Sequence, residues 1–141
     1  MQSLKERVQD NTNAGFLRDD ALLAIVMLTD EDDASTSQNN FTMGVSGTTP
    51  TDWNPADEVM FLDTLKGNRT RWAAGVIAGD GDCSSSFGNA ANGARLKDFV
   101  QQANGQGSTQ AVFSSICEGN LTNGLKNALD TFQAACGQII L

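Results

Sequence analysis

The side chains best suited to chemistry in this 141-residue chain are carboxylates that follow apolar stretches. Asp30, Asp32 and Asp33 come after one such stretch, and Asp80 and Asp82 come after the next. Carboxylate oxygens are good ligands for hard cations such as Mg²⁺ and Ca²⁺. Paired carboxylates can also share acid and base roles in hydrolysis, but a solvated acidic turn rarely supplies the different environments these roles need. Acidic turns without any ligand are the simpler alternative.

The chain contains no histidine. Histidine is the commonest general base and a frequent metal ligand, so Ser-His-Asp and Cys-His catalysis are excluded. The three cysteines are too few for a zinc cluster without histidine, and none lies in a Cys-x-x-Cys motif. We therefore expect a protein that is not an enzyme.

Three apolar runs predict the strands that position these carboxylates. They span residues 22–28, 72–78 and 110–116, and helical patterns lie between and after them at 54–67, 94–103 and 121–135. Right-handed crossovers then give an α/β domain over residues 1–141, in which a parallel sheet of about three strands lies between helices in three layers. Residues 34–53, rich in Ser, Thr, Asn and Gly, form a long loop that we expect to be functional or mobile.

The run 22–28 is the strongest strand signal, although a short buried helix would have the same composition. It is apolar at every position, which is typical of a parallel strand covered on both faces at the centre of a sheet. The chain supplies only one neighbour for it. If it is an edge strand, its unpaired backbone groups invite pairing with another chain. The sequence thus predicts either a missing half domain or a dimer through this strand.

The predicted topology also pairs two of the cysteines. Cys83 follows the second strand and Cys117 the third, so both lie at the carboxyl edge of the sheet and form the natural disulfide pair. Cys117 and Cys136 would lie near opposite ends of the last helix, about 20 Å or more apart and beyond disulfide reach. We expect Cys136 to be a buried thiol or bonded outside this chain. A disulfide indicates an oxidising compartment, and three reduced, buried cysteines in a cytosolic protein are the alternative.

Residues 16–33, FLRDDALLAIVMLTDEDD, resemble the fourth strand of von Willebrand factor A domains, especially those of bacterial surface lipoproteins. In that family an apolar strand ends in Thr-Asp or Ser-Asp. A looser resemblance continues through 74–79 and 115–118, so the chain resembles the C-terminal half of this Rossmann-like domain. The resemblance implies protein recognition through a divalent cation at the carboxyl ends of the strands, with Asp30 at the position of one ligand.

The resemblance also implies that the metal site is incomplete, because the strands that carry the family's other ligands are absent. Weak binding of Mg²⁺ or Ca²⁺ would involve Asp30, Asp32 and Asp33. The rest of the expected binding rim consists of Thr29, Glu31, Asp80 and Asp82. The string Asp33-Ala34-Ser35-Thr36-Ser37 spells the family's Asp-x-Ser-x-Ser motif, but it begins five positions beyond Leu28, and we interpret it as a chance match.

Charge and hydropathy narrow the choice of partners. A net charge of −8 disfavours nucleic acid, and no apolar run approaches the roughly 20 residues of a membrane span. Residues 1–10 are amphipathic and lack the apolar region of a signal peptide. We expect an exported bacterial protein, located in the periplasm, at the outer membrane or outside the cell, that acts as a protein-binding module. The alternative is a truncated structural fragment that self-associates without metal or ligand.

Overall fold

The computed structural model describes residues 1–10, 12, 14–33, 54–86 and 88–139. Three helices and three strands lie where the sequence predicts them, which confirms the α/β class. Helix α1 and a short hairpin are additions that the sequence patterns did not indicate. The elements are α1 (Gln2–Gln9), β1 (Leu23–Leu28), α2 (Pro55–Lys66), β2 (Trp72–Ala78), β3 (Cys83–Ser85), β4 (Gly88–Ala90), α3 (Ala94–Ala103), β5 (Ala111–Ser115) and α4 (Leu121–Cys136).

The main sheet has the strand order β1-β2-β5, and all three strands are parallel. Every residue of β2 is buried, so β2 is the central strand. The expectation that the run 22–28 is covered on both faces is wrong. Strand β1 is an edge strand, and its residues alternate between buried and exposed positions from Leu23 to Val26. Composition could not separate the two strands, because both are apolar throughout.

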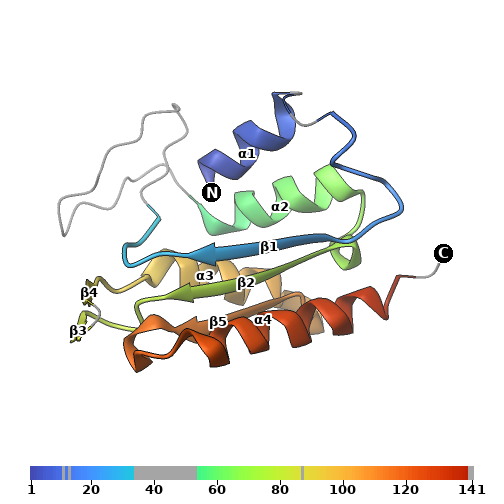
Figure 1. Cartoon of the computed structure of the whole chain (residues 1–141). Helices are drawn as coiled ribbons and strands as arrows, with labels where there is room; N and C mark the ends of the chain where they lie inside the picture. Colours follow the sequence, from blue (N-terminus) through green and yellow to red (C-terminus); the bar gives the residue numbers. More distant parts are fainter. Residues whose placement is uncertain (11, 13, 34–53, 87, 140–141) are drawn as a thin grey trace.

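Helices cover the two faces of the sheet unequally (Figure 1). Helices α2 and α3 pack on one face, with α1 beside α2, and α4 is the one described helix on the other. Among the described residues, no helix is long and apolar enough to cross a membrane. The main core lies on the α2–α3 side and includes Leu23, Ile25, Val59, Leu62, Trp72, Val76, Leu96 and Phe99.

Helix α2 begins and ends at the residues that its sequence signals predict. The side chain of Asn54 accepts a hydrogen bond from the backbone N–H of Ala56, and Pro55 occupies the first turn. Gly67 ends the helix with φ of 72°, in the left-handed region that glycine adopts without strain. Local capping chemistry therefore fixes the bounds of this helix.

Small residues hold α4 over β2 and β5. A Cβ atom added to Gly75 of β2 would lie 2.3 Å from the Cβ atom of Ala128, so the helix approaches the strand closely only because Gly75 has no side chain. Asn127 Nδ2 donates to Ser114 Oγ on β5 at 3.2 Å. Residues 127 and 129 lie on opposite flanks of Ala128, so the flank that carries Leu129 points toward β1.

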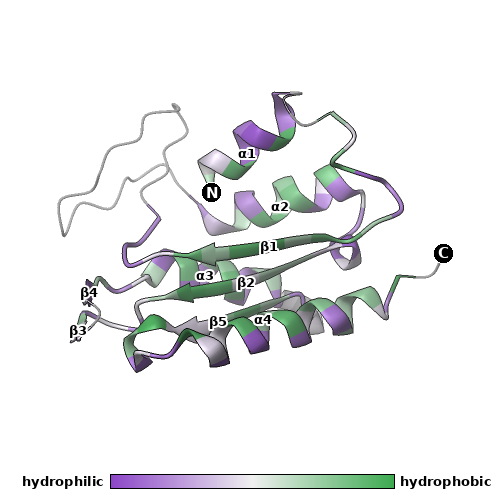
Figure 2. Cartoon of the chain, in the orientation of Figure 1, coloured by the Kyte–Doolittle hydropathy of each residue, from purple (hydrophilic) through white to green (hydrophobic). Residues whose placement is uncertain are grey.

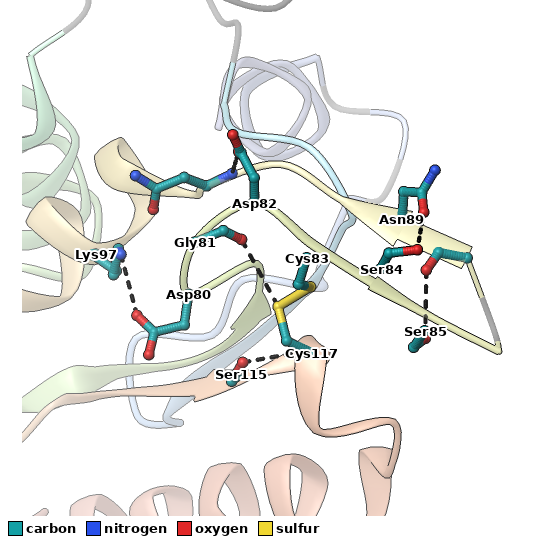
Figure 3. Close-up of a disulfide and its surroundings, with 12 residues drawn as sticks. Asp80, Gly81, Asp82, Cys83, Ser84, Ser85, Asn89, Lys97, Ser115 and Cys117 are labelled. Carbon is teal, nitrogen blue, oxygen red and sulfur yellow. Dashed lines mark hydrogen bonds and ion pairs between the residues drawn. A yellow bond between two sulfur atoms is a disulfide. The ribbon is translucent and has the colours of Figure 1, made fainter.

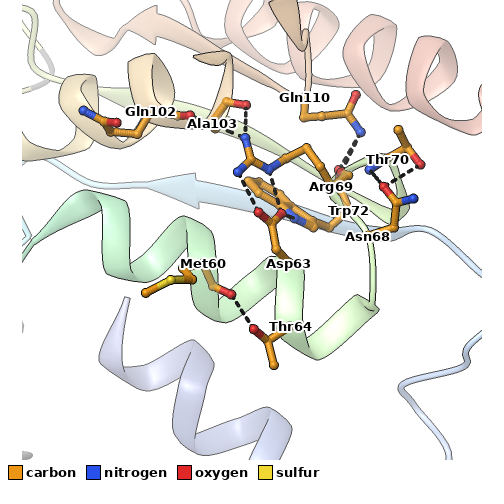
Figure 4. A network of polar contacts seen from close by, with 10 residues as sticks. All are labelled: Met60, Asp63, Thr64, Asn68, Arg69, Thr70, Trp72, Gln102, Ala103 and Gln110. Carbon is orange, nitrogen blue, oxygen red and sulfur yellow. Dashed lines mark hydrogen bonds and ion pairs between the residues drawn. The ribbon is translucent and has the colours of Figure 1, made fainter. Parts of the chain in front are cut away.

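A polar network joins α2 to the start of β2 (Figure 4). Trp72 is fully buried, and its Nε1 donates to Asp63 Oδ1 at 2.8 Å. The guanidinium of Arg69 donates to both oxygens of Asp63 at 2.6 Å and to the carbonyl of Ala103 at 2.9 Å. Because Ala103 is the last residue of α3, one arginine ties α2 to α3 beside the packed ring of Trp72.

Because of this network, the free energy of unfolding depends on pH. Desolvation raises the pKa of Asp63, but hydrogen bonds from Arg69 and Trp72 and the charge of Arg69 outweigh it, so the pKa is lowered from 3.8. The stabilisation is therefore present above pH 3.8 and is lost as pH falls through the lowered value. We expect Asp63→Asn to be less stable than wild type at about pH 5 and the difference to shrink toward about pH 2 in urea unfolding. A constant difference over this range would contradict the assignment.

The close contact of α4 with β2 gives a second prediction. Gly75→Ala places a methyl group against Ala128, and we expect overpacking to lower the free energy of unfolding by about 1–3 kcal/mol. Gly105→Ala is the matched control, because its added methyl group meets no atom within 4 Å. Urea unfolding of both variants measures the difference, and equal stabilities would show that α4 does not pack tightly through Gly75.

Candidate functional site

A small open cleft of about 310 Å³ lies at the carboxyl end of the sheet, between the end of β1, the β3–β4 hairpin and the residue that follows β5. Open α/β sheets commonly bind ligands at this end. Strand β1 contributes Leu28 and the residues that follow it, Thr29 and Asp30, and the β3–β4 hairpin forms another wall through Asn89. Ile116, after β5, completes the lining near the start of α4. The predicted rim residues Thr29 and Asp30 therefore do lie at a cleft.

A disulfide between Cys83 and Cys117 braces this end of the molecule, as the sequence predicts (Figure 3). The two Cα atoms are 5.9 Å apart. Cys83 begins β3, and Cys117 lies just beyond β5, so the bond ties the hairpin to the sheet. The expectation that Cys136 is buried is wrong, whereas a bond to a partner outside this chain stays a prediction. Cys136 makes no disulfide within this chain and is exposed, because Ala135 and not Cys136 occupies the buried side of the last turn of α4.

Asp32 and Asp33 have structural contacts of their own. The carboxylate of Asp32 accepts hydrogen bonds from the backbone N–H groups of Arg95 and Leu96 at 3.2–3.3 Å. These N–H groups belong to the first turn of α3, where the helix dipole favours a negative charge. Asp33 Oδ2 accepts from the amino group of Met1 at 2.7 Å. Asp32 thus caps a helix from a loop more than 60 residues away, a role that the sequence analysis missed.

The other acidic residues of the predicted rim are dispersed. Asp80 pairs with Lys97 of α3 at 3.1 Å, and Asp82 accepts from the backbone N–H of Asn92 at 3.0 Å (Figure 3). Asp30 and Glu31 are exposed. The backbone carbonyl of Asp30 accepts from Ala91 N–H, and the backbone of Glu31 bonds with Thr29 Oγ1. The structure therefore separates the carboxylates that are close in sequence.

The described donors do not fit a bound Mg²⁺ or Ca²⁺ ion. These ions take about six or more oxygen ligands, whereas Asp32 and Asp33 face N–H and ammonium groups. Within the part of the chain that the structure describes, no three His, Cys, Asp or Glu side chains come together as a metal site. The long loop 34–53 and nearly all of the Asp-x-Ser-x-Ser string at 33–37 lie outside the described residues. A cation site stays a prediction.

A second surface adjoins the cleft at Leu28, and we name it the β1–α4 face. It consists of the side chains of Ala24, Val26 and Leu28 on β1 together with Leu125 and Leu129 on the neighbouring flank of α4. Val26 and Leu28 are 51% and 52% exposed, and Leu125 and Leu129 are 45% and 65% exposed. Figure 2 shows β1 as an apolar strand above the line of α4. Large apolar side chains stay exposed here because α4 packs mainly on β2 and β5.

The residues of β1 whose side chains lie on this face also direct their backbone N–H and C=O groups toward the outer edge of the strand. Thr29 N–H donates to Ile77 O of β2 at 3.1 Å, which fixes the alternation of the strand. The N–H and C=O groups of a residue in a parallel strand point to the same edge, and consecutive residues alternate. Ala24, Val26 and Leu28 therefore direct their backbone groups away from β2. No described strand pairs with that edge.

Comparisons with protein-family models, with curated proteins and with solved structures give no match to this chain. The resemblance of residues 16–33 to the fourth strand of von Willebrand factor A domains therefore stays a prediction. The function has to be argued from the two surfaces themselves.

The disulfide gives a prediction about stability. It closes a loop between positions 34 residues apart, so we expect the double change Cys83→Ala and Cys117→Ala to lower the free energy of unfolding by about 2–4 kcal/mol. Cys136→Ala is the matched control and should stay within about 0.5 kcal/mol of wild type, because Cys136 is exposed. Urea unfolding without reductant measures both. An unchanged double variant would mean that the bond is not formed in the folded protein.

Proposed function

We propose that this chain is a non-enzymatic protein-binding module that recognises an extended segment of another protein by pairing it with the open edge of β1. The segment adds a fourth strand to the sheet, and its apolar side chains cover the β1–α4 face. The exposure of Val26 and Leu28 beside an unpaired strand edge is the observation that supports this function. Strand addition is a common mode of peptide recognition.

Strand β1 itself lacks the residues by which edge strands usually prevent strand addition. Exposed edge strands are commonly protected by lysine, proline, a bulge or an inward-pointing charge. Strand β1 has the sequence LAIVML and contains none of these residues. Its outward backbone groups at Ala24, Val26 and Leu28 repeat at every second residue, the spacing that a partner strand needs.

Two interactions contribute to the free energy of binding a segment at β1. Each added backbone hydrogen bond contributes about 0.5–1.5 kcal/mol net. Completing the burial of a half-exposed valine or leucine adds about 1 kcal/mol per side chain. Ordering the bound segment offsets much of this, so we expect affinities in the micromolar range.

The proposal includes the resemblance to the C-terminal half of a von Willebrand factor A domain and an extracytoplasmic location. The parallel order β1-β2-β5 and the Thr29-Asp30 ending of β1 are compatible with that family. The Cys83–Cys117 disulfide is compatible with an oxidising compartment. Self-association through β1 is the second candidate, because another copy of the chain also offers an apolar edge strand.

Proline at a single position tests strand addition. Ten-residue peptides displayed on phage are selected on wild-type protein, and we expect enriched sequences to alternate aliphatic and polar residues. Val26→Pro removes an outward N–H group while leaving the β1–β2 hydrogen bonds in place, so it should weaken binding of the enriched peptides by at least about ten-fold. Fluorescence anisotropy with synthetic peptides measures the change.

Val26→Ala is the matched control, since it shortens the side chain but keeps the N–H group. It should weaken binding only about two- to five-fold, the effect of exposing less apolar surface to the peptide. Circular dichroism and urea unfolding check that both variants stay folded. Equal binding by folded Val26→Pro and wild-type protein would contradict recognition through this edge.

A further inference from the structure

The carboxyl end of β1 carries charge that the fold leaves uncompensated. Asp30 and Glu31 come directly after the strand and are exposed. Asp30 lines the cleft together with Leu28, whose side chain also belongs to the β1–α4 face. A segment paired with Ala24, Val26 and Leu28 would therefore end beside these two carboxylates.

The cations at this end of the sheet are already engaged elsewhere. Lys97 Nζ pairs with Asp80, and the guanidinium of Arg95 donates to the backbone carbonyl of Asp33. Asp32 is neutralised in part by the first turn of α3. Among the described residues, no cationic side chain bonds to the carboxylate of Asp30 or Glu31. The local field therefore favours a cation supplied from outside.

At the amino end of β1, positive charges offset the negative ones. Two cationic side chains approach the acidic residues there, because Lys66 Nζ donates to the carbonyl of Arg18 and Arg71 donates to the carbonyl of Asp19. These cations, together with Arg18 itself, offset the charges of Asp19 and Asp20. The open edge is thus polarised, with excess negative charge only at its carboxyl end.

We propose that the segment recognised at β1 carries lysine or arginine residues at the end that lies beside Asp30 and Glu31. This inference rests on the proposed function and specifies the chemistry of its partner: alternating aliphatic residues followed or preceded by a cationic pair. The apolar stretch supplies the affinity, and the cations supply selectivity and faster association.

A second copy of the chain fits the open edge less completely. Helix α4 sits over β2 and β5, about 7 Å from β1 across the sheet. Two copies related by a two-fold axis between their β1 strands would place the two α4 helices about 19 Å apart on the same face, whereas packed helices are 8–10 Å apart. Such a dimer would leave most of Leu125 and Leu129 uncovered. A segment of another protein is free of this constraint.

Two synthetic peptides test the charge preference. Both alternate valine and threonine over six residues; one has two lysines at each end and the other has two glutamates at each end. At about 20 mM salt we expect the lysine peptide to bind three- to ten-fold more tightly, since exposed pairs are individually weak. The preference should shrink in 0.5 M salt, where exposed charges are screened.

Paired charge variants locate the effect. Asp30→Asn with Glu31→Gln should abolish the preference for the lysine peptide, whereas the matched control, Asp19→Asn with Asp20→Asn at the other end of β1, should keep it. Equal binding of the two peptides, or a preference that survives the change of Asp30 and Glu31, would overturn this inference. If both peptides still require the Val26 N–H group, the proposed function stands without it.

Two outcomes concern the proposed function itself. If neither peptide binds wild-type protein at concentrations up to about 1 mM, recognition by strand addition fails, and this inference fails with it. The second outcome is dimerisation of the chain through β1, which sedimentation equilibrium measures. If a dimer forms, is lost in Val26→Pro and competes with the peptides, then a second copy occupies the edge. That result would overturn the choice of a cationic segment of another protein.

Discussion

The width of one helix decides which part of this protein is exposed. An α-helix with its side chains is about 10–12 Å across, and neighbouring strands are about 4.8 Å apart, so one helix covers roughly two strands. Gly75 and Ala128 fix α4 over β2, and Asn127 ties it to β5. The third strand, β1, therefore keeps one apolar face open. On the opposite face α2 and α3 pack over the sheet, and the buried side chains of β1 there, Leu23 and Ile25, belong to the main core.

The carboxyl end of the sheet is held by several fixed contacts, and it also carries two exposed carboxylates. The disulfide fixes the β3–β4 hairpin against the end of β5, and Asp32 fixes the loop after β1 against the first turn of α3. These constraints hold Asp30 and Glu31 at the end of the open edge without neutralising them. The apolar β1–α4 face and the acidic end of β1 thus form one continuous surface that meets at Leu28.

The sequence predicted the elements well and their environments less well. Capping at Asn54 and Gly67 and the apolar spacing of α3 and α4 placed the helices, because these signals act within a few residues. The hairpin β3–β4 was missed because its strands are three residues long and polar. Asp32 looked like a metal ligand because its real partners, the N–H groups of Arg95 and Leu96, are more than 60 positions away.

The sequence by itself determined the α/β class, the parallel sheet and the pairing of Cys83 with Cys117, because strand order and right-handed crossovers leave few topologies. Only the tertiary structure decided which apolar strand is central. Strands β1 and β2 have similar compositions, and burial of β2 depends on neighbours and helices supplied by distant segments. The same long-range packing separated the acidic residues, since each carboxylate takes the partner that the fold brings near, and sequence distance carries no information about that choice.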